Sequence, residues 1–229
     1  IATKLVEAGH SVTVVTYSDK NSYDFDTRYP FQLVRVVRGN NKLSNYFAFF
    51  RTVLRELKNK DIAYSLDWLA AGLPLVLAAA IRRVPVVIRV GGDYIWETYL
   101  RSRASPMPLT EFYERMLYKN YNILFRVISF VLRRAFVIFN SDTQRTMYHR
   151  FYHLRPDWTS VIHNPMPEKG WLGVQREKAN DEIVFAGRFI AMKNIASLLT
   201  AFAKTRIPFK LVLIGTGPEE HRVRNAIQE

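Results

Sequence analysis

The sequence predicts an α/β fold with two doubly wound domains, both of them incomplete in this chain. Short apolar runs rich in β-branched residues alternate with helical patterns along the 229 residues. This alternation is typical of parallel sheets with helices on both faces. It is interrupted once, by a segment rich in proline, glycine and charge, and it restarts afterwards. Hydrophobic residues make up 48% of the chain, which is enough to build real cores.

The first domain is expected to span residues 1–164 and to lack its first strand, because residues 1–10 resemble the end of a helix closed by Gly9. Near-continuous apolar runs predict its strands, as for strands buried on both faces. These runs are 11–17, 31–37, 61–67, 84–90, 135–140 and 159–164. Helical spacing predicts helices at 45–59, 69–83, 109–134 and 141–153. Ser141 and Gln144 are expected to form a capping box for the last helix.

A second domain is predicted to begin after a linker at residues 165–181. Residues 182–229 are read as the start of this domain, truncated after two strand–helix units. The strands are expected at 182–187 and 209–215, and the helices at 194–205 and 218–229. Ligands of such sheets bind beyond the carboxyl ends of the strands.

Composition limits the chemistry. The 33 Lys and Arg against 20 Asp and Glu give a formal net charge of +13, which attracts polyanions, anionic membranes and phosphorylated molecules. The chain has no cysteine, which excludes disulfides, Cys-ligated zinc and thiol nucleophiles. Neither a nucleophile elbow nor a Walker loop occurs, so nothing supports a hydrolase or an NTP-hydrolysing enzyme.

The strongest site candidate is the turn after the strand at 182–187. Gly187 lets the backbone turn sharply and approach a ligand, and Asn194 is placed to cap the next helix. Arg188 and Lys193 bracket this turn. Two cations beside a helix N-terminus suit a diphosphate, with a bidentate guanidinium and a point-charge ammonium. The alternative is that both cations simply face water.

A second turn contains Gly215 and Gly217, followed by Pro218. It lacks the third glycine of the dinucleotide fingerprint, because Glu220 stands there. Two acidic residues at the start of the next helix would repel a phosphate. The two glycines are therefore candidates for donor binding, with a structural turn at least as strong an interpretation.

On the first domain, Gly92 and Asp93 follow the strand at 84–90. Asp93 is placed either to bind acceptor hydroxyls or to cap the next helix, and the two interpretations stay open. Trp96 and Glu97 are read as packing and surface residues. The spacing of His149 and His153 is compatible with metal binding, but a solvated pair is favoured and no metal site is expected.

Several motifs together resemble family-4-type retaining glycosyltransferases with the GT-B fold, which has two Rossmann-like domains. "FAGRFIAMKNIASLLTAFA" is similar to the start of their donor domain, and "LVLIGTGPEE" to their next strand and turn. "EAGHSVTVVT", "VIRVGGDYIWE" and "VIHNPMP" match further segments in the right order. The resemblance covers nearly the whole chain.

The resemblance implies a hexosyltransferase-type enzyme that moves a sugar from a nucleotide-sugar donor to a glycan or lipid-linked acceptor, as in polysaccharide biosynthesis. Arg188 and Lys193 would hold the donor diphosphate and stabilise its charge as the sugar leaves, with Gly187, Gly215 and Gly217 nearby. No cofactor or metal is expected, and no nucleic-acid partner. The opening strand and the later donor-binding glutamates are missing, so the chain itself is expected to be inactive. A family histidine is replaced by Gly91.

A cytoplasmic location is expected, with peripheral contact at the inner membrane face as an option. The basic, aromatic stretch 99–135 either docks on an anionic membrane or is a domain helix packed on the sheet, and the second is favoured. A non-catalytic basic module that binds nucleotides or nucleic acid is the alternative function. A dinucleotide-dependent oxidoreductase is disfavoured because its three-glycine turn is absent.

Overall fold

The computed structural model describes residues 1–101, 107–165, 181–205 and 208–228. The chain divides into two compact units. Unit 1 comprises Ile1–Gly91 and Lys119–Asn164, and unit 2 comprises Gly92–Tyr118 and Pro165–Glu229. Apart from its two end residues, the predicted linker at 165–181 lies outside the described residues. The division of the chain into domains at this linker stays a prediction.

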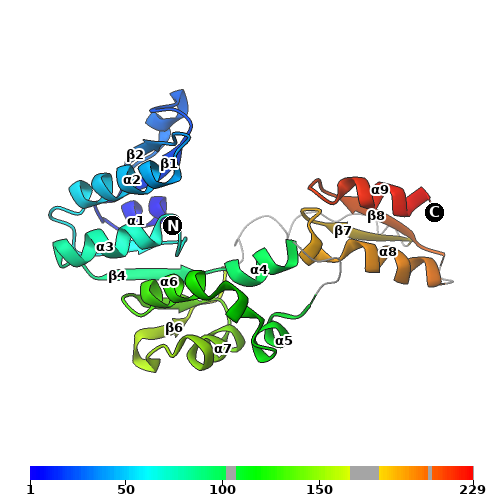
Figure 1. The fold of residues 1–229 in the computed structure, drawn as a ribbon. Helices are drawn as coiled ribbons and strands as arrows, with labels where there is room; N and C mark the ends of the chain where they lie inside the picture. The colour runs from blue at the N-terminus through cyan, green and yellow to red at the C-terminus, as the bar shows by residue number, and fades with distance from the viewer. Residues whose placement is uncertain (102–106, 166–180, 206–207, 229) are drawn as a thin grey trace. The chain divides into compact units, whose positions relative to one another are not determined.

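Unit 1 contains two parallel sheets (Figure 1). In the first, β1 (Thr13–Ser18) pairs with β2 (Gln32–Val37). In the second, neighbouring strands follow the order β3 (Ala63–Ser65), β4 (Val86–Val90), β5 (Phe136–Phe139) and β6 (Thr159–Val161). Every strand pairing among the described residues is parallel, which confirms the interpretation of the strand–helix alternation.

The helices of unit 1 are α1 (Ala2–Glu7), α2 (Lys42–Glu56), α3 (Gly72–Arg82), α6 (Asn122–Leu132) and α7 (Asp142–Tyr152), with short 3₁₀ turns η1 (Asp24–Arg28) and η3 (Pro156–Trp158). Helix α7 packs on β5 and β6 through a stack of aromatic rings. Tyr148 lies at its centre, with ring centroids 5.2 Å from Phe139, 5.7 Å from Trp68 and 4.7 Å from Tyr152. This stack holds α7 against Phe139 at the carboxyl end of β5.

The expected capping box of α7 is half correct. Ser141 Oγ accepts a hydrogen bond from the Gln144 backbone N–H at 3.3 Å. The Gln144 side chain, however, accepts from the Asn140 N–H at 3.5 Å rather than from Ser141. In a capping box the Gln144 side chain would accept from the backbone N–H of Ser141, and here it accepts from the residue before it, Asn140.

The prediction of one helix over 109–134 is wrong. The segment forms α5 (Leu109–Glu114), the 3₁₀ turn η2 (Leu117–Tyr121) and α6. Met116 has a positive φ of 55°, a left-handed conformation that ends α5, and the helix restarts only at Asn122. The apolar spacing continues through this break, so periodicity alone does not reveal it.

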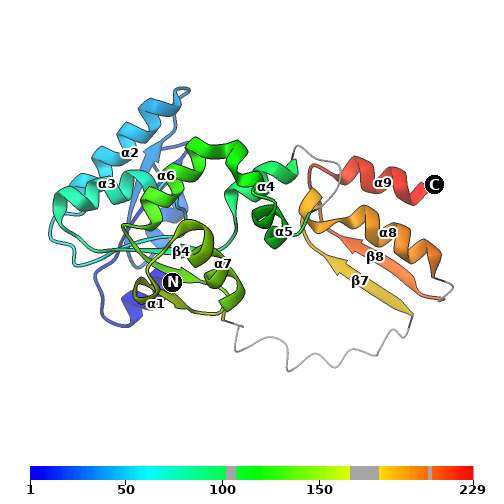
Figure 2. The same ribbon diagram turned by 60° about the horizontal axis from the view of Figure 1, so that its bottom comes forward.

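The C-terminal part of unit 2 is a parallel pair, β7 (Glu182–Ala186) and β8 (Lys210–Ile214), with α8 (Ile195–Lys204), α9 (Glu220–Gln228) and the 3₁₀ turn η4 (Ala191–Lys193). Both α8 and α9 lie over one face of the pair (Figure 2). The small core under them consists of Phe189, Ile195 and Val223, flanked by Phe185, Leu199 and Leu213.

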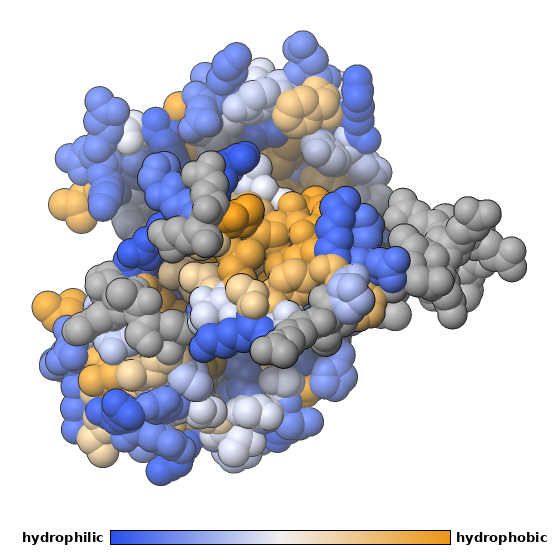
Figure 3. Space-filling model, turned by 90° about the vertical axis from the view of Figure 1, so that its right-hand side faces the viewer, coloured by the Kyte–Doolittle hydropathy of each residue, from blue (hydrophilic) through white to orange (hydrophobic). Residues whose placement is uncertain are grey.

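On the strands, Val184 and Ile214 are each 56% exposed. Figure 3 shows a patch of hydrophobic surface on the face that it presents. A parallel sheet with apolar residues on both faces normally carries helices on both.

The remaining part of unit 2 consists of α4 (Tyr94–Arg101) and α5, joined by aromatic contacts. The Phe112 ring lies 5.1 Å from the Tyr99 ring and 5.3 Å from the Tyr113 ring, and the Trp96 indole N–H donates to the Met107 carbonyl at 2.8 Å. Within the described ranges, no helix combines the length and the apolar character needed to cross a bilayer.

Candidate functional site

The turn from β7 to α8 continues the sheet beyond the strand ends. The Gly187 N–H donates to the Ile214 carbonyl and the Phe189 N–H to the Thr216 carbonyl, each at 2.9 Å. The Glu219 N–H donates in turn to the Phe189 carbonyl at 3.0 Å. The backbone bonds therefore fasten the predicted donor turn to the turn that follows β8, and Gly187 and Arg188 lie beside Gly215 and Gly217.

The glycines of these two turns have different roles. A Cβ on Gly215 would lie 1.9 Å from the Gly187 carbonyl oxygen, and one on Gly217 would lie 2.3 Å from the Phe189 carbonyl oxygen. Both positions therefore exclude any side chain. At Gly187, by contrast, a Cβ would make only ordinary contacts of 3.5 Å and 3.6 Å with the Phe185 ring. Close backbone packing explains Gly215 and Gly217, whereas packing does not require a glycine at 187.

The cations of the first turn are available to a ligand. Arg188 and Lys193 are exposed, and neither side chain forms an ion pair or a hydrogen bond with any described residue. Phe189 lies between them in the sequence. Its phenyl ring is buried and anchors the turn to the core. Both cations thus lie at the carboxyl edge of the β7–β8 pair, where the sequence places them.

The acidic residues of the second turn are neutralised locally. Glu219 pairs with Arg222 at 3.1 Å and Glu220 pairs with Arg224 at 2.8 Å, both along α9. The sequence suggests that these carboxylates would repel a phosphate, and their arginine partners reduce that repulsion.

Asn194 begins α8 in a way the sequence does not predict. It has a left-handed backbone with φ 48°, and its side-chain oxygen accepts from the Ser197 hydroxyl at 2.8 Å rather than from a backbone N–H. No side chain among the described residues caps the first N–H groups of α8. The partial positive charge of this helix start adds to that of the two cations.

Asp93 acts structurally. It is 1% exposed, its Oδ1 accepts from the Trp96 backbone N–H at 2.8 Å, and its Oδ2 accepts from the Tyr113 hydroxyl at 2.6 Å. Both carboxylate oxygens thus serve α4 and α5, which favours the capping interpretation over direct acceptor binding. Within unit 2, α4 packs against η4, the turn that ends at Lys193.

Glu97 is partly buried, so the sequence interpretation of it as a surface residue is incomplete. Burial raises the pKa of its carboxyl group, the nearby Asp93 charge raises it further, and Arg101 partly offsets this. Its Oε1 lies 2.5 Å from where a Cβ on Gly92 would be, so it occupies the space beside that glycine. The only available signal in the sequence is its position one helical turn after Asp93.

The interpretation of His149 and His153 as a solvated pair is wrong for His149, whereas His153, directly after α7, is exposed. His149 is partly buried, and its two ring nitrogens lie 3.0 Å from the Leu154 carbonyl and 2.9 Å from the Thr159 hydroxyl. Both nitrogens therefore have protein partners. Among the described residues, no group of three or more His, Asp or Glu side chains is arranged to hold a metal ion.

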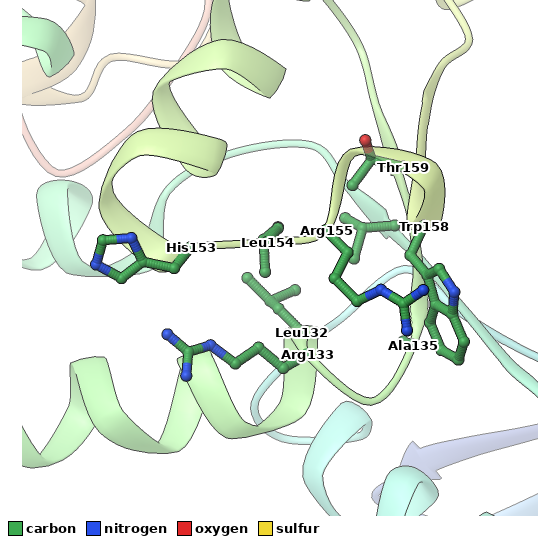
Figure 4. Close-up of a pocket in the computed structure, with 9 residues that line it drawn as sticks. Leu132, Arg133, Ala135, His153, Leu154, Arg155, Trp158 and Thr159 are labelled. Carbon is green, nitrogen blue, oxygen red and sulfur yellow. The ribbon is translucent and has the colours of Figure 1, made fainter.

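One cavity, of about 210 Å³, lies in unit 1 at the amino ends of β5 and β6 (Figure 4). Arg133, His153, Arg155 and Trp158 line it. The Arg133 Nε donates to the Tyr152 carbonyl at the end of α7 at 3.0 Å, and Arg155 stacks over Trp158. A cation at a helix C-terminus is ordinarily stabilising, so the position of Arg133 beside the end of α7 is explained without a ligand.

The model of "Glycosyltransferase Family 4" matches residues 1–168 of the chain. No protein with a curated description matches it. Among solved structures, that of Anabaena HepE in complex with UDP and glucose is similar with a TM-score of 0.62 at 20% identity, covering 94% of this chain and 57% of that one.

Two further structures cover a similar share of the chain. CalG4, the calicheamicin glycosyltransferase, gives a TM-score of 0.51 at 15% identity over 95% of this chain and 62% of its own. Arabidopsis thaliana UGT89C1 complexed with UDP-L-rhamnose gives 0.50 at 11% over 97% and 63%. The chain thus spans less than two thirds of the length of these structures.

These likenesses show the fold, which is of the GT-B type. Because the family model covers well over half of the sequence, the chain belongs to glycosyltransferase family 4.

Proposed function

We propose that the protein transfers a sugar, of the hexose type, from a nucleotide-sugar donor to a hydroxyl group of a glycan or lipid-linked acceptor, with retention of anomeric configuration. The observation that carries the proposal is the pair of exposed cations Arg188 and Lys193, which have no partner among the described residues, on a turn fixed to the sheet edge. Family membership supports the reaction type. The complexes of HepE with UDP and of UGT89C1 with UDP-L-rhamnose support a uridine diphosphate donor.

The proposed chemistry follows from charge. As the bond between the sugar and the diphosphate breaks, negative charge grows on the leaving phosphate. A guanidinium offers that phosphate a bidentate contact, and an ammonium offers a point charge. Positive groups that are already in place stabilise such a transition state without reorganisation. We assign this role to Arg188 and Lys193, without a metal ion.

Calorimetric titration of the chain with UDP, UDP-glucose and uridine tests the donor site. We expect binding that requires the diphosphate and that weakens about tenfold or more in Arg188→Ala, because a hydrogen bond to a charged group contributes about 1.5–3 kcal/mol. Arg222→Ala is the matched control, since Arg222 already pairs with Glu219. Equal UDP affinity in wild type and Arg188→Ala would contradict the assignment.

The alternative function gives a different result in the same assay. A non-catalytic module that binds nucleotides would bind UDP but transfer no sugar. One that binds nucleic acid would bind single strands tightly and would respond to UDP no better than to uridine. This outcome would replace the proposed transfer reaction.

Peripheral membrane contact is a finer proposal. Arg126 on α6 and Arg133 and Arg134 directly after it are exposed, while Ile128 and Val131 are buried, so these basic side chains are accessible. Ile123, at the start of the helix, is 82% exposed. Such a surface suits an anionic bilayer that carries a lipid-linked acceptor. Co-sedimentation with phosphatidylglycerol vesicles, but not with phosphatidylcholine vesicles, is the expected result.

A further inference from the structure

The carboxyl ends of β5 and β6 carry two side chains that the proposed donor site does not use. Asn140 directly follows β5, and His163 comes shortly after β6. The His163 Nδ1 lies 2.9 Å from the Asn140 carbonyl oxygen. A carbonyl oxygen can only accept, so Nδ1 must carry the proton and donate. In the neutral imidazole, Nε2 is then a hydrogen-bond acceptor, and the residue is exposed.

The amide of Asn140 is poorly satisfied. Its Oδ1 is buried and has no hydrogen-bond partner within the part of the chain that the structure describes. Its Nδ2 donates to the Gly91 carbonyl at 3.5 Å, which is at the long limit for such a bond. Exchanging the two amide atoms would place two acceptors against each other, so the orientation is fixed but weak. A buried polar atom without a partner is unfavourable, and turning the side chain outward would give Oδ1 access to a donor.

The backbone that carries His163 is held on both sides. From β4, the Arg89 Nη2 donates to the Ile162 carbonyl at 2.7 Å and to the Asn164 Oδ1 at 3.0 Å. Together with the bond from His163 to Asn140, these contacts fix the segment against the ends of β4 and β5. The imidazole is therefore positioned in advance, whereas the Asn140 amide is held by a single long hydrogen bond, which a ligand could replace.

We propose that Asn140 and His163 form a binding site for a carbohydrate, in which His163 Nε2 and the reoriented Asn140 Oδ1 accept hydrogen bonds from sugar hydroxyl groups. Both are neutral acceptors, so they suit hydroxyl groups and not phosphates, which would need donors. The inference rests on the proposed function, since the carbohydrate would be the acceptor. It moves acceptor recognition from Asp93, whose oxygens are engaged, to the ends of β5 and β6.

Nuclear magnetic resonance on the ¹⁵N-labelled chain tests the site with defined probes: methyl α-glucopyranoside, methyl α-mannopyranoside and, for comparison, inorganic phosphate. We expect at least one glycoside to shift the Asn140 side-chain amide signals and the His163 ring nitrogens, with phosphate having no effect there. Asn140→Ala and His163→Ala should each weaken that glycoside about fivefold or more. His221→Ala and Asn225→Ala are matched controls, because these residues form a similar exposed pair on α9.

Several results would overturn the site. One is that neither glycoside shifts these signals, and another is that phosphate shifts them instead. Unchanged glycoside affinity in both alanine variants is a third. The wild-type chain alone gives a fourth test, since an Nε2–H tautomer of His163 would contradict the geometry even if a variant failed to fold.

The titration with UDP separates this inference from the proposed function. Glycoside shifts without UDP binding at Arg188 would leave the carbohydrate site standing and remove the donor assignment. UDP binding without glycoside shifts would do the reverse.

Discussion

The two strand-to-helix turns of unit 2 look alike in sequence and differ in physical role. Each follows a parallel strand and contains glycine and charged residues. In the β7–α8 turn the cations Arg188 and Lys193 have no partner among the described residues, and Gly187 has room for a side chain. In the β8–α9 turn the charges pair along the helix, and both glycines are closely packed. The second turn is hydrogen-bonded to the first and packs closely against it, whereas the first leaves its two cations exposed, as the proposed donor site requires.

The largest expected effect is a difference in stability between alanine substitutions at Gly215 and at Gly187. Gly215→Ala places a Cβ 1.9 Å from the Gly187 carbonyl oxygen, and we expect it to destabilise this part of the chain by about 2–3 kcal/mol, as overpacking does. Gly187→Ala should cost less than about 0.5 kcal/mol, because surface changes without a clash usually do. The measurement is amide hydrogen exchange at Phe189 and Val223. Similar losses of protection in both variants would show that the two turns do not differ as described.

The next effect concerns the cations. Arg188→Lys keeps the charge but loses the bidentate geometry, so we expect UDP affinity to fall about threefold to tenfold, since roughly one hydrogen bond is lost. Arg222→Lys on the supporting turn should leave the affinity within about twofold. Fluorescence or calorimetric titration measures both. A stronger effect at Arg222 than at Arg188 would reverse the roles of the turns.

Much of this difference could not be predicted from sequence. Alternation of apolar runs predicts the strands, and the glycine and cations after the apolar run at 182–187 predict a turn at the carboxyl end of β7, where the structure has one. Spacing cannot say that Gly215 lies against the Gly187 carbonyl, because that contact joins two turns through tertiary packing. The same limit explains the break at Met116, which occurs inside an uninterrupted apolar pattern.

Polar residues show the limit most clearly. Asp93 and Glu97 stand one helical turn apart in the sequence. The Asp93 carboxylate accepts hydrogen bonds from the Trp96 N–H and the Tyr113 hydroxyl, whereas the Glu97 carboxyl is partly buried and its pKa is raised. The hydroxyl partner of Asp93 comes from another helix. The weak amide contact of Asn140 likewise depends on the end of a neighbouring strand.

A third turn, after β4, extends the comparison to pH. The pKa of Glu97 is raised in the fold by burial and then by the Asp93 charge. A raised pKa favours the protonated form in the fold. The fold therefore loses stability as the pH rises from the pKa of Glu97 in the unfolded chain to its higher pKa in the folded chain. We expect Glu97→Gln to remove this pH-dependent loss. Asp93→Asn keeps a capping side chain and should lower the Glu97 pKa, which carboxyl ¹³C shifts would report. An unchanged Glu97 titration in Asp93→Asn would contradict the coupling.

The smallest effect tests whether the paired acids of the second turn matter to the first. Glu220→Gln frees Arg224, whose guanidinium makes contacts of 2.8 Å and 3.1 Å with that carboxylate. The pair is exposed, so its loss should change the free energy of unfolding by no more than about 0.5 kcal/mol. Removing one negative charge near the donor turn should raise UDP affinity by less than about twofold, and added salt should abolish the gain.

Glu182→Gln at the opposite end of β7, where Glu182 pairs with Lys210 at 3.0 Å, is the matched control. If both variants raised UDP affinity equally, net charge would account for the gain, whereas a gain confined to Glu220→Gln would place the anion at the β7–α8 turn.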